Sequence, residues 1–146
     1  MSKEKVGLVL KLFVSISGIS TRKNKTSIIL NKLGVQGDKF YNKDLERSIL
    51  ISSIDSYKLM KKRDINMPLG YLGENILIDY NPYKLEIGTK IKIGDTILEI
   101  SQNCTICNHL ASIDKNIPEL LKNDRGIFAK VIQGGKINFE DEVYIV

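Results

Sequence analysis

The sequence predicts a mainly β protein, a barrel or a sandwich, with one or two short helices. Short runs of apolar and β-branched residues recur along the chain, and turn residues separate them. Helical periodicity does not alternate with these runs. Many short strands joined by hairpin turns are typical of barrels and sandwiches, whereas a doubly wound α/β fold needs a helix between successive strands.

The predicted strands share an apolar character and are bounded by turn-forming residues such as glycine, asparagine and proline. They are Val6–Val14, Thr26–Leu30, Ser48–Ser52, Asn75–Asp79, Gly88–Ile93, Thr96–Ser101, Gly126–Ile132 and Glu142–Val146. Gly94 and Asp95 predict a tight hairpin turn between two of them. The segment from Ser15 to Lys25 is polar and contains glycine, so we expect a loop there.

Two segments are predicted to be helical. Ser53–Lys62 has apolar positions at helical spacing, and its first serine can cap the helix. Ile117–Lys122 is expected to form about one helical turn, with Pro118 near its start, where a missing N–H is tolerated.

Size and composition are those of one soluble globular domain. The chain has 146 residues, of which 42% are hydrophobic and 27% charged, so residues 1–146 are expected to form one domain with a core of their own. The first apolar run, Val6–Ile16, is interrupted by Lys11 and is too short to cross a bilayer. We also find no signal-peptide pattern at the start. We therefore expect a cytoplasmic protein that does not associate with membranes.

The net charge of +5 is unevenly distributed. Residues 1–73 contain 14 Lys and Arg against 6 Asp and Glu, whereas residues 74–146 contain 8 against 11. A basic half can attract phosphate-bearing ligands or nucleic acid, and it can equally be a solvated lysine-rich surface. Charge alone leaves both interpretations open.

The two cysteines, Cys104 and Cys107, form a single C-x-x-C close to the only histidine, His109. Two cysteines are too few for a disulfide scaffold, and in a reducing compartment they are expected to be thiols. Thiols and imidazole can bind a soft metal, carry a persulfide or exchange disulfides. A structural zinc site needs four ligands and finds at most three here. The alternative of two small buried cysteines without a chemical role stays open.

Two glycine-rich segments, Gly34–Asp38 and Gly70–Asn75, lie between predicted strands. Neither is a nucleotide-binding fingerprint, because no helix follows at the required place. Each can be a tight turn that needs positive φ. The second also brings backbone N–H groups together with the carboxylate of Glu74 and the carboxamide of Asn75. Exposed amides in such a turn could hold an anionic oxygen.

Two arginines stand next to predicted strands. Arg47 directly precedes Ser48–Ser52, and Arg125 directly precedes Gly126. A lone arginine is usually a surface ion-pair partner, but at a strand end near a glycine-rich turn it can bind a phosphate or carboxylate through paired hydrogen bonds. Both interpretations are open for both residues.

Taken in order, six segments of the chain resemble motifs of the MOSC domain (molybdenum-cofactor sulfurase C-terminal domain) family. They are Gly34–Phe40, Arg47–Leu50, Gly70–Ile76, Leu85–Gly94, Gln102–Cys107 and Gly126–Gly135. Each motif alone is weak, but six in the family's order, over nearly the whole chain, are strong. The spacing from Gln102 matches Cys107, and not Cys104, to the key cysteine of the family.

Three residues depart from the family pattern. Phe40 stands where the family often has histidine, which removes any ligand or proton role there. Asn108 stands where some members have a histidine directly after the cysteine, which weakens the case for a proton-transfer partner of the thiol. Glu140, before Asp141, replaces the usual glycine, which we interpret as turn variation.

The resemblance implies a pyruvate-kinase-like β-barrel in which Cys107 binds molybdenum or carries sulfur. It implies the molybdenum cofactor, a molybdopterin, as the ligand. The residues that would bind it in this chain are Arg47, Gly73, Glu74, Asn75, Gln102 and Asp38. The implied activity is sulfur transfer or the reduction of N-hydroxylated compounds with an external electron donor, and the sequence does not separate the two.

The resemblance also implies partners. The chain has no room for a pyridoxal-phosphate enzyme, so pyridoxal phosphate would belong to a partner, a cysteine desulfurase. The chain carries no ferredoxin-type cysteine set, so electrons would come from an electron-transfer protein.

The alternative is a non-catalytic module that binds nucleic acid or an anionic metabolite, in which Cys107 is incidental. Nucleic-acid-binding barrels need exposed aromatic side chains along a strand face. The six Tyr and four Phe of this chain are scattered, so the sequence favours a small-molecule ligand over nucleic acid.

Overall fold

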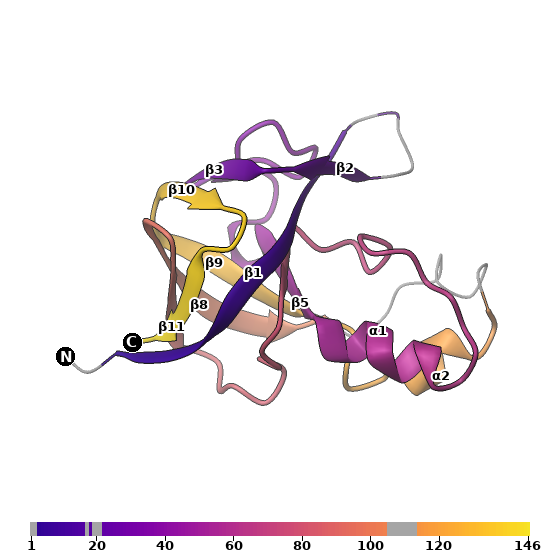
Figure 1. Cartoon of the computed structure of the whole chain (residues 1–146). Helices are drawn as coiled ribbons and strands as arrows, with labels where there is room; N and C mark the ends of the chain where they lie inside the picture. Colours follow the sequence, from indigo (N-terminus) through magenta and orange to yellow (C-terminus); the bar gives the residue numbers. More distant parts are fainter. Residues whose placement is uncertain (1–2, 17, 19–21, 105–113) are drawn as a thin grey trace.

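A closed β-barrel of seven strands dominates the computed structural model (Figure 1), which describes residues 3–16, 18, 22–104 and 114–146. In the order in which they neighbour one another, the strands are β1 (Glu4–Ser15), β11 (Glu142–Ile145), β7 (Lys90–Ile93), β8 (Thr96–Asn103), β9 (Ile127–Gln133), β5 (Ile49–Ser53) and β6 (Ile76–Ile78). Strand β6 then pairs with β1 and closes the ring. Only the β5–β6 pairing is parallel among these strands. The predicted mainly β fold is confirmed.

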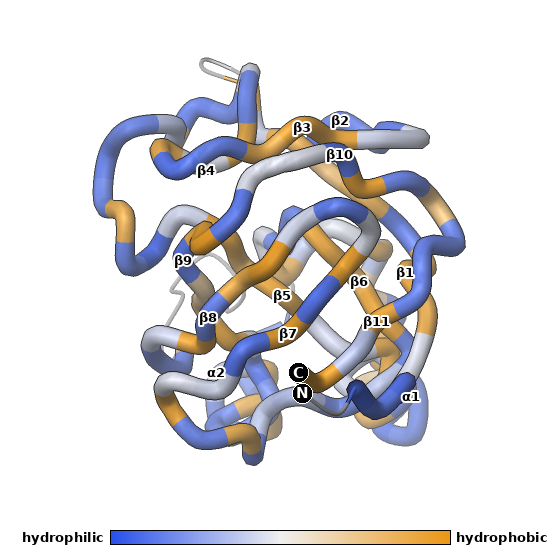
Figure 2. The backbone as a smooth tube through the Cα atoms, turned by 90° about the vertical axis from the view of Figure 1, so that its left-hand side faces the viewer, coloured by the Kyte–Doolittle hydropathy of each residue, from blue (hydrophilic) through white to orange (hydrophobic). Residues whose placement is uncertain are grey.

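A second sheet lies over one end of the barrel (Figure 2). It consists of β10 (Gly135–Asn138), β3 (Ser27–Asn31) and β4 (Gly34–Val35). Its inward side chains, Ile28, Leu30 and Ile137, are part of the same hydrophobic cluster as the barrel interior. The sheet therefore closes this end with apolar side chains.

Strand β2 (Arg22–Lys25) corrects the expectation of a loop from Ser15 to Lys25. It pairs antiparallel with the last residues of β1, from Leu12 to Ser15. Its four residues are polar and carry no apolar alternation, so nothing local predicts a strand. The backbone hydrogen bonds offered by β1 determine its conformation.

The barrel interior is filled by alternate residues of its strands, as the pleat requires. Along β8, Thr96, Leu98 and Ile100 are buried, and the residues between them are half-buried. Leu50 on β5 stands between two core residues, Ile49 and Ile51, so its side chain points away from the barrel interior.

Helix α1 (Ile54–Lys61) and the single turn of α2 (Ile117–Leu120) lie side by side outside the barrel (Figure 1). Ser53 caps α1 as predicted, because its hydroxyl accepts a hydrogen bond from the N–H of Asp55 (3.1 Å). A second apolar cluster joins both helices to the outer face of β6 and to the segment before it. Its buried members are Tyr57, Met60, Ile65, Met67, Leu72, Leu77, Ile117 and Leu121.

The parallel pairing of β5 with β6 explains this arrangement, because parallel strands need a crossover connection. Residues 54–75 form that crossover and cover the outer face of the two strands. Within the described residues, no helix is long and apolar enough to cross a membrane.

Candidate functional site

Three of the sequence motifs meet around the side chain of Leu50. A Cβ on Gly126 would stand 2.9 Å from Leu50 Cδ1, and a Cβ on Gly73 would stand 3.7 Å from Leu50 Cδ2. The same position on Gly126 is 3.6 Å from the Cβ of Cys104, whose N–H donates to the Gly126 carbonyl (3.0 Å). The turn that contains Gly73, the start of β9 and the first cysteine of the C-x-x-C are therefore neighbours.

Cys107 lies outside the described residues, as does His109. The predicted role of Cys107 as metal ligand or sulfur carrier stays a prediction. Cys104 is the last described residue before that segment, and it is buried. Among the described residues, no group of three or more His, Cys, Asp or Glu side chains could hold a metal ion.

Asp38 and Asn75 lie together, as the predicted ligand set requires. Asp38 Oδ1 accepts hydrogen bonds from the N–H of Ser15 (2.6 Å) and from Asn75 Nδ2 (3.3 Å). Asn75 Oδ1 accepts from the N–H of Leu50 (3.1 Å), and its Nδ2 also donates to the carbonyl of Phe13 (3.3 Å). The two side chains thus join β1 to β5 and are fixed in place.

Arg22, on β2, adds a cation to this group. Its Nη1 lies 3.9 Å from Asp38 Oδ1, and its Nη2 lies 3.3 Å from the position of a Cβ on Gly73. This residue is not among the site residues predicted from the sequence, because its segment was expected to be a loop. All four residues of β2 are polar, so nothing in the local sequence would have identified Arg22 as a site residue.

Glu74 is fully buried in a polar cluster behind the turn. Its Oε2 accepts hydrogen bonds from Ser52 Oγ (2.7 Å) and from the hydroxyl of Tyr57 on α1. Burial, together with the negative charge of Glu74, raises the pKa of Tyr57 far above its usual value. Tyr57 is therefore a neutral hydrogen-bond donor to this carboxylate.

Most backbone N–H groups of the Gly70–Asn75 turn already have acceptors within the protein. The N–H groups of Gly70 (3.0 Å) and Leu72 (3.4 Å) donate to the Tyr57 hydroxyl. Gly73 donates to the carbonyl of Gly70 (3.0 Å), and Asn75 donates to that of Leu50 (2.8 Å). These four amides are therefore not free to hold an anion, unlike the exposed amides that the sequence suggested. Tyr57, from a distant element, is the acceptor that the motif alone could not reveal.

Arg47 and Gln102 flank the ring of Phe128 on the outside of the barrel. Arg47 is exposed, and its guanidinium carbon lies 4.6 Å from the centre of that ring. Phe128 is the strand partner of Gln102 on one side and of Leu50 on the other. Directly paired residues point to the same face of a sheet, so Arg47, Gln102 and Leu50 share one surface.

Arg125 is buried at the start of β9, with 5% of its surface exposed. Its Nε and Nη1 atoms are buried and have no hydrogen-bond partner among the described residues. The same holds for Oε1 of Glu74. Buried polar atoms without partners are rare in proteins, and a bound water, a bound ion or a catalytic role can account for them.

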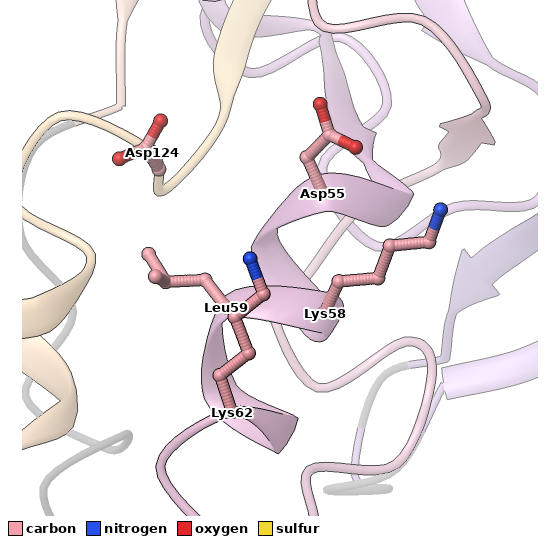
Figure 3. Close-up of a pocket in the computed structure, with 5 residues that line it drawn as sticks. All are labelled: Asp55, Lys58, Leu59, Lys62 and Asp124. Carbon is pink, nitrogen blue, oxygen red and sulfur yellow. The ribbon is translucent and has the colours of Figure 1, made fainter.

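A separate surface pocket of about 300 Å³ lies against α1 (Figure 3). It is lined by Asp55, Lys58, Leu59, Lys62 and Asp124. None of the predicted site residues lines it, and its charged side chains of both signs define no ligand.

The comparisons with known proteins identify the family and the fold. The family model of the MOSC domain matches residues 36–144. No curated protein sequence matches the chain.

Several solved structures share the fold at low sequence identity. The YuaD protein from Bacillus subtilis superposes with a TM-score of 0.84 at 16% identity, covering 98% of this chain and 96% of that one. YiiM from Escherichia coli gives a TM-score of 0.70 at 18% identity, covering 95% of this chain and 69% of that one. YiiM from Geobacillus stearothermophilus gives 0.69 at 15% identity, covering 99% and 75%.

The family model spans well over half of the chain and includes every predicted site residue. It also includes the segments that meet around Leu50. The chain belongs to the MOSC domain family.

Proposed function

We propose that the chain is a molybdenum-cofactor-associated module that binds a molybdopterin cofactor, carries sulfur on Cys107, or does both. The observation that supports this most is the meeting of Gly73, Gly126 and Cys104 around Leu50. Two glycines from different motifs and the first cysteine of the C-x-x-C thus lie around one side chain. The missing side chains of the two glycines let these segments pack closely around Leu50, which brings the backbone next to Cys104 into the same place as Gly73 and Arg22.

The residues around Leu50 fit a phosphate-bearing cofactor. Arg22 lies next to Gly73, and Arg125 directly precedes Gly126. Arg125 has two buried nitrogen atoms with no partner among the described residues. Arginine binds phosphate well because its planar donors match the phosphate oxygens. In this proposal Arg22 and Arg125 hold the phosphate, and Cys107 is the ligand of the metal.

When bound, the cofactor would supply two-electron redox chemistry, such as the reduction of N-hydroxylated compounds. The chain itself contributes a soft thiolate and a fixed surround. Tyr57 and Glu74 hold the turn that carries Gly73, and Asp38 and Asn75 hold the adjoining strand ends.

Sulfur carriage needs only the thiolate of Cys107 and a partner. The thiolate would attack the outer sulfur of a persulfide on a cysteine desulfurase. The sulfur–sulfur bond of the donor then breaks, the partner's cysteine leaves as a thiolate, and Cys107 holds the persulfide. The pyridoxal phosphate belongs to that partner. For the reduction, an electron-transfer protein is the expected partner, and the cytoplasm is the proposed location of both activities.

The test is to express the protein in a host that makes the cofactor and to measure bound molybdenum and pterin. We expect retention in the wild type and its loss in Cys107→Ala. Cys104→Ala is the control, because this cysteine is buried and is not matched to the key position of the family. Metal-free wild-type protein that shifts oligonucleotides in a salt-dependent way would instead support the binding-module alternative.

A further inference from the structure

Arg125 carries a positive charge that no carboxylate of this chain neutralises. The residue is 5% exposed, and its Nε and Nη1 have no hydrogen-bond partner among the described residues. No Asp or Glu oxygen of the described residues lies within 4.0 Å of its guanidinium nitrogens; the ion pairs found there involve other cations.

The segments outside the described residues cannot supply the missing carboxylate either. Residues 1–2, 17, 19–21 and 105–113 contain no Asp and no Glu in the sequence. All 17 acidic side chains of the chain therefore belong to its described part. A carboxylate or other oxyanion in direct contact with Arg125 therefore has to come from another molecule.

The charge cannot be removed by deprotonation, because a guanidinium stays protonated in proteins. A buried charge without a partner is strongly unfavourable, whereas a paired and hydrogen-bonded one is tolerated. The buried guanidinium therefore lowers the stability of the ligand-free protein. An anion bound to it would remove this cost.

The place of Arg125 connects it with the proposed site. The carbonyl of Gly126, the next residue, accepts a hydrogen bond from the N–H of Cys104. A Cβ placed on Gly126 would lie 3.6 Å from the Cβ of Cys104. Cys107 follows three residues later in the sequence. The backbone of Arg125 is therefore one residue away from the pairing at which the segment with the proposed metal ligand begins.

We infer that Arg125 is the anion-binding residue of this site and that its ligand is a tetrahedral oxyanion. Two sources share this chemistry, a free oxyanion such as phosphate or molybdate and the phosphate ester of the proposed cofactor. The second source rests on the proposed function, whereas the first does not.

Glu74 is the competing partner within the chain. Its Oε1 is also buried without a hydrogen bond, but it is more than 4.0 Å from the nitrogens of Arg125. A bridging water could link the two groups. In that case the two charges would stabilise each other, and Arg125 would not need an external anion. The sign of the change in melting temperature caused by Arg125→Met separates these two cases.

The experiment measures the melting temperature of cofactor-free protein in a buffer without oxyanions and then with added inorganic phosphate. We expect phosphate at about 100 times its Kd to raise the melting temperature of the wild type by about 5 °C or more. Arg125→Met should lose this response and should melt at or above the wild-type temperature without phosphate. Arg63→Met is the matched control, because Arg63 is exposed, and it should respond as the wild type does.

Two results would overturn the inference. One is an equal phosphate response, or none, in the wild type and in Arg125→Met. The other is a lower melting temperature of Arg125→Met that Glu74→Gln restores in the double variant, since Glu74 would then be the partner. If Arg125→Met does not fold, Arg125→Gln serves in the same titration.

The two sources are separated by repeating the titration with protein purified from a cofactor-producing host. If the phosphate ester of the cofactor occupies Arg125, the loaded protein should show no further response to inorganic phosphate. If the free oxyanion is the ligand, the response persists. The phosphate response should also survive in Cys107→Ala, so loss of molybdenum binding and loss of anion binding are distinguishable failures.

Discussion

The hydroxyl of Tyr57 on α1 donates a hydrogen bond to the buried carboxylate of Glu74 and accepts two from the backbone of the Gly70–Asn75 turn. One side chain therefore fixes both the carboxylate and the backbone of a family motif. The crossover between β5 and β6 places α1 against this turn, so the topology of the barrel and the geometry of the site depend on each other.

Replacing Tyr57 by Phe should destabilise the protein by about 1–3 kcal/mol, because a buried carboxylate oxygen loses a donor and two amides lose their acceptor. Chemical denaturation monitored by circular dichroism measures this loss. Tyr144→Phe is the control, since Tyr144 is partly exposed and bonds to an exposed glutamate. Equal stability of the two variants would show that the Tyr57 hydroxyl does not hold the turn.

Tyr83 predicts how stability changes at high pH. Burial, together with the charges of Glu74 and Asp124, raises its pKa to about 12, although a hydrogen bond shared with Ser56 and one from the N–H of Ser53 oppose the shift. The folded state therefore holds this proton more tightly than the unfolded chain, in which the pKa is near 10. The stabilising contribution is complete below pH 10 and is lost as the pH rises through about 12.

The measurement is the free energy of unfolding between pH 9 and pH 12, compared with that of Tyr83→Phe. We expect a fall with pH that is shallower in the variant, by on the order of 2 kcal/mol over the range. Part of the fall should remain, because the pKa of Tyr57 is raised further still. Identical pH profiles would contradict the buried environment of Tyr83.

The elements that the sequence predicted are those whose pattern is local. The long apolar run became β1, the serine-capped segment became α1, and the glycine turn at Gly94 joins β7 to β8. Strands β2 and β10 were not predicted, because one is wholly polar and the other has a single apolar side chain, Ile137. Their conformation comes from pairing: β2 pairs with β1, and β10 pairs with β3, which is distant from it in the sequence.

The candidate site was predicted only in part, for a related reason. The motif order brought out Asp38, Asn75 and Gly73, which the structure places together. The sequence left Arg125 open to either a surface ion pair or anion binding, and only its burial and its lack of an ion pair among the described residues favour anion binding. Burial is a property of the folded chain, and no spacing of residues around an arginine reveals it.

Gly73 and Gly88 allow a matched test of the crowded turn. Both have positive φ, +88° and +96°, but a Cβ on Gly73 would meet Arg22 and Leu50, whereas one on Gly88 would meet nothing within 4 Å. Both alanine variants should lose about 1 kcal/mol from backbone strain. Only Gly73→Ala should in addition reduce molybdenum retention, because it displaces Arg22. Equal retention in the two variants would remove Gly73 from the site.

Replacing Glu140 by glycine should stabilise the protein. Glu140 has a φ of 70°, which lies in the left-handed region. This conformation is unfavourable for any residue with a Cβ, and the family usually has glycine at this position. Glu140→Gly should raise the unfolding free energy by about 0.5–1 kcal/mol, as seen in denaturant titrations. Destabilisation instead would show that the Glu140 side chain contributes contacts that outweigh the strain.

The reactivity of the two cysteines tests the assignment of the sulfur chemistry. Cys104 is buried, with 8% of its surface exposed, and its N–H is bonded to Gly126. A thiol reacts as an accessible thiolate, so Cys104 should alkylate slowly in the folded protein. If Cys107 carries sulfur or binds molybdenum, it has to be reached by a partner or ligand, and it should alkylate faster than Cys104 at neutral pH.

Peptide mass spectrometry after timed exposure to iodoacetamide gives both rates. Cys104→Ala should leave the fast rate unchanged, and Cys107→Ala should abolish it. Slow and equal labelling of both residues in the wild type would mean that Cys107 is as inert as its neighbour, and sulfur carriage on this residue would then have to be abandoned.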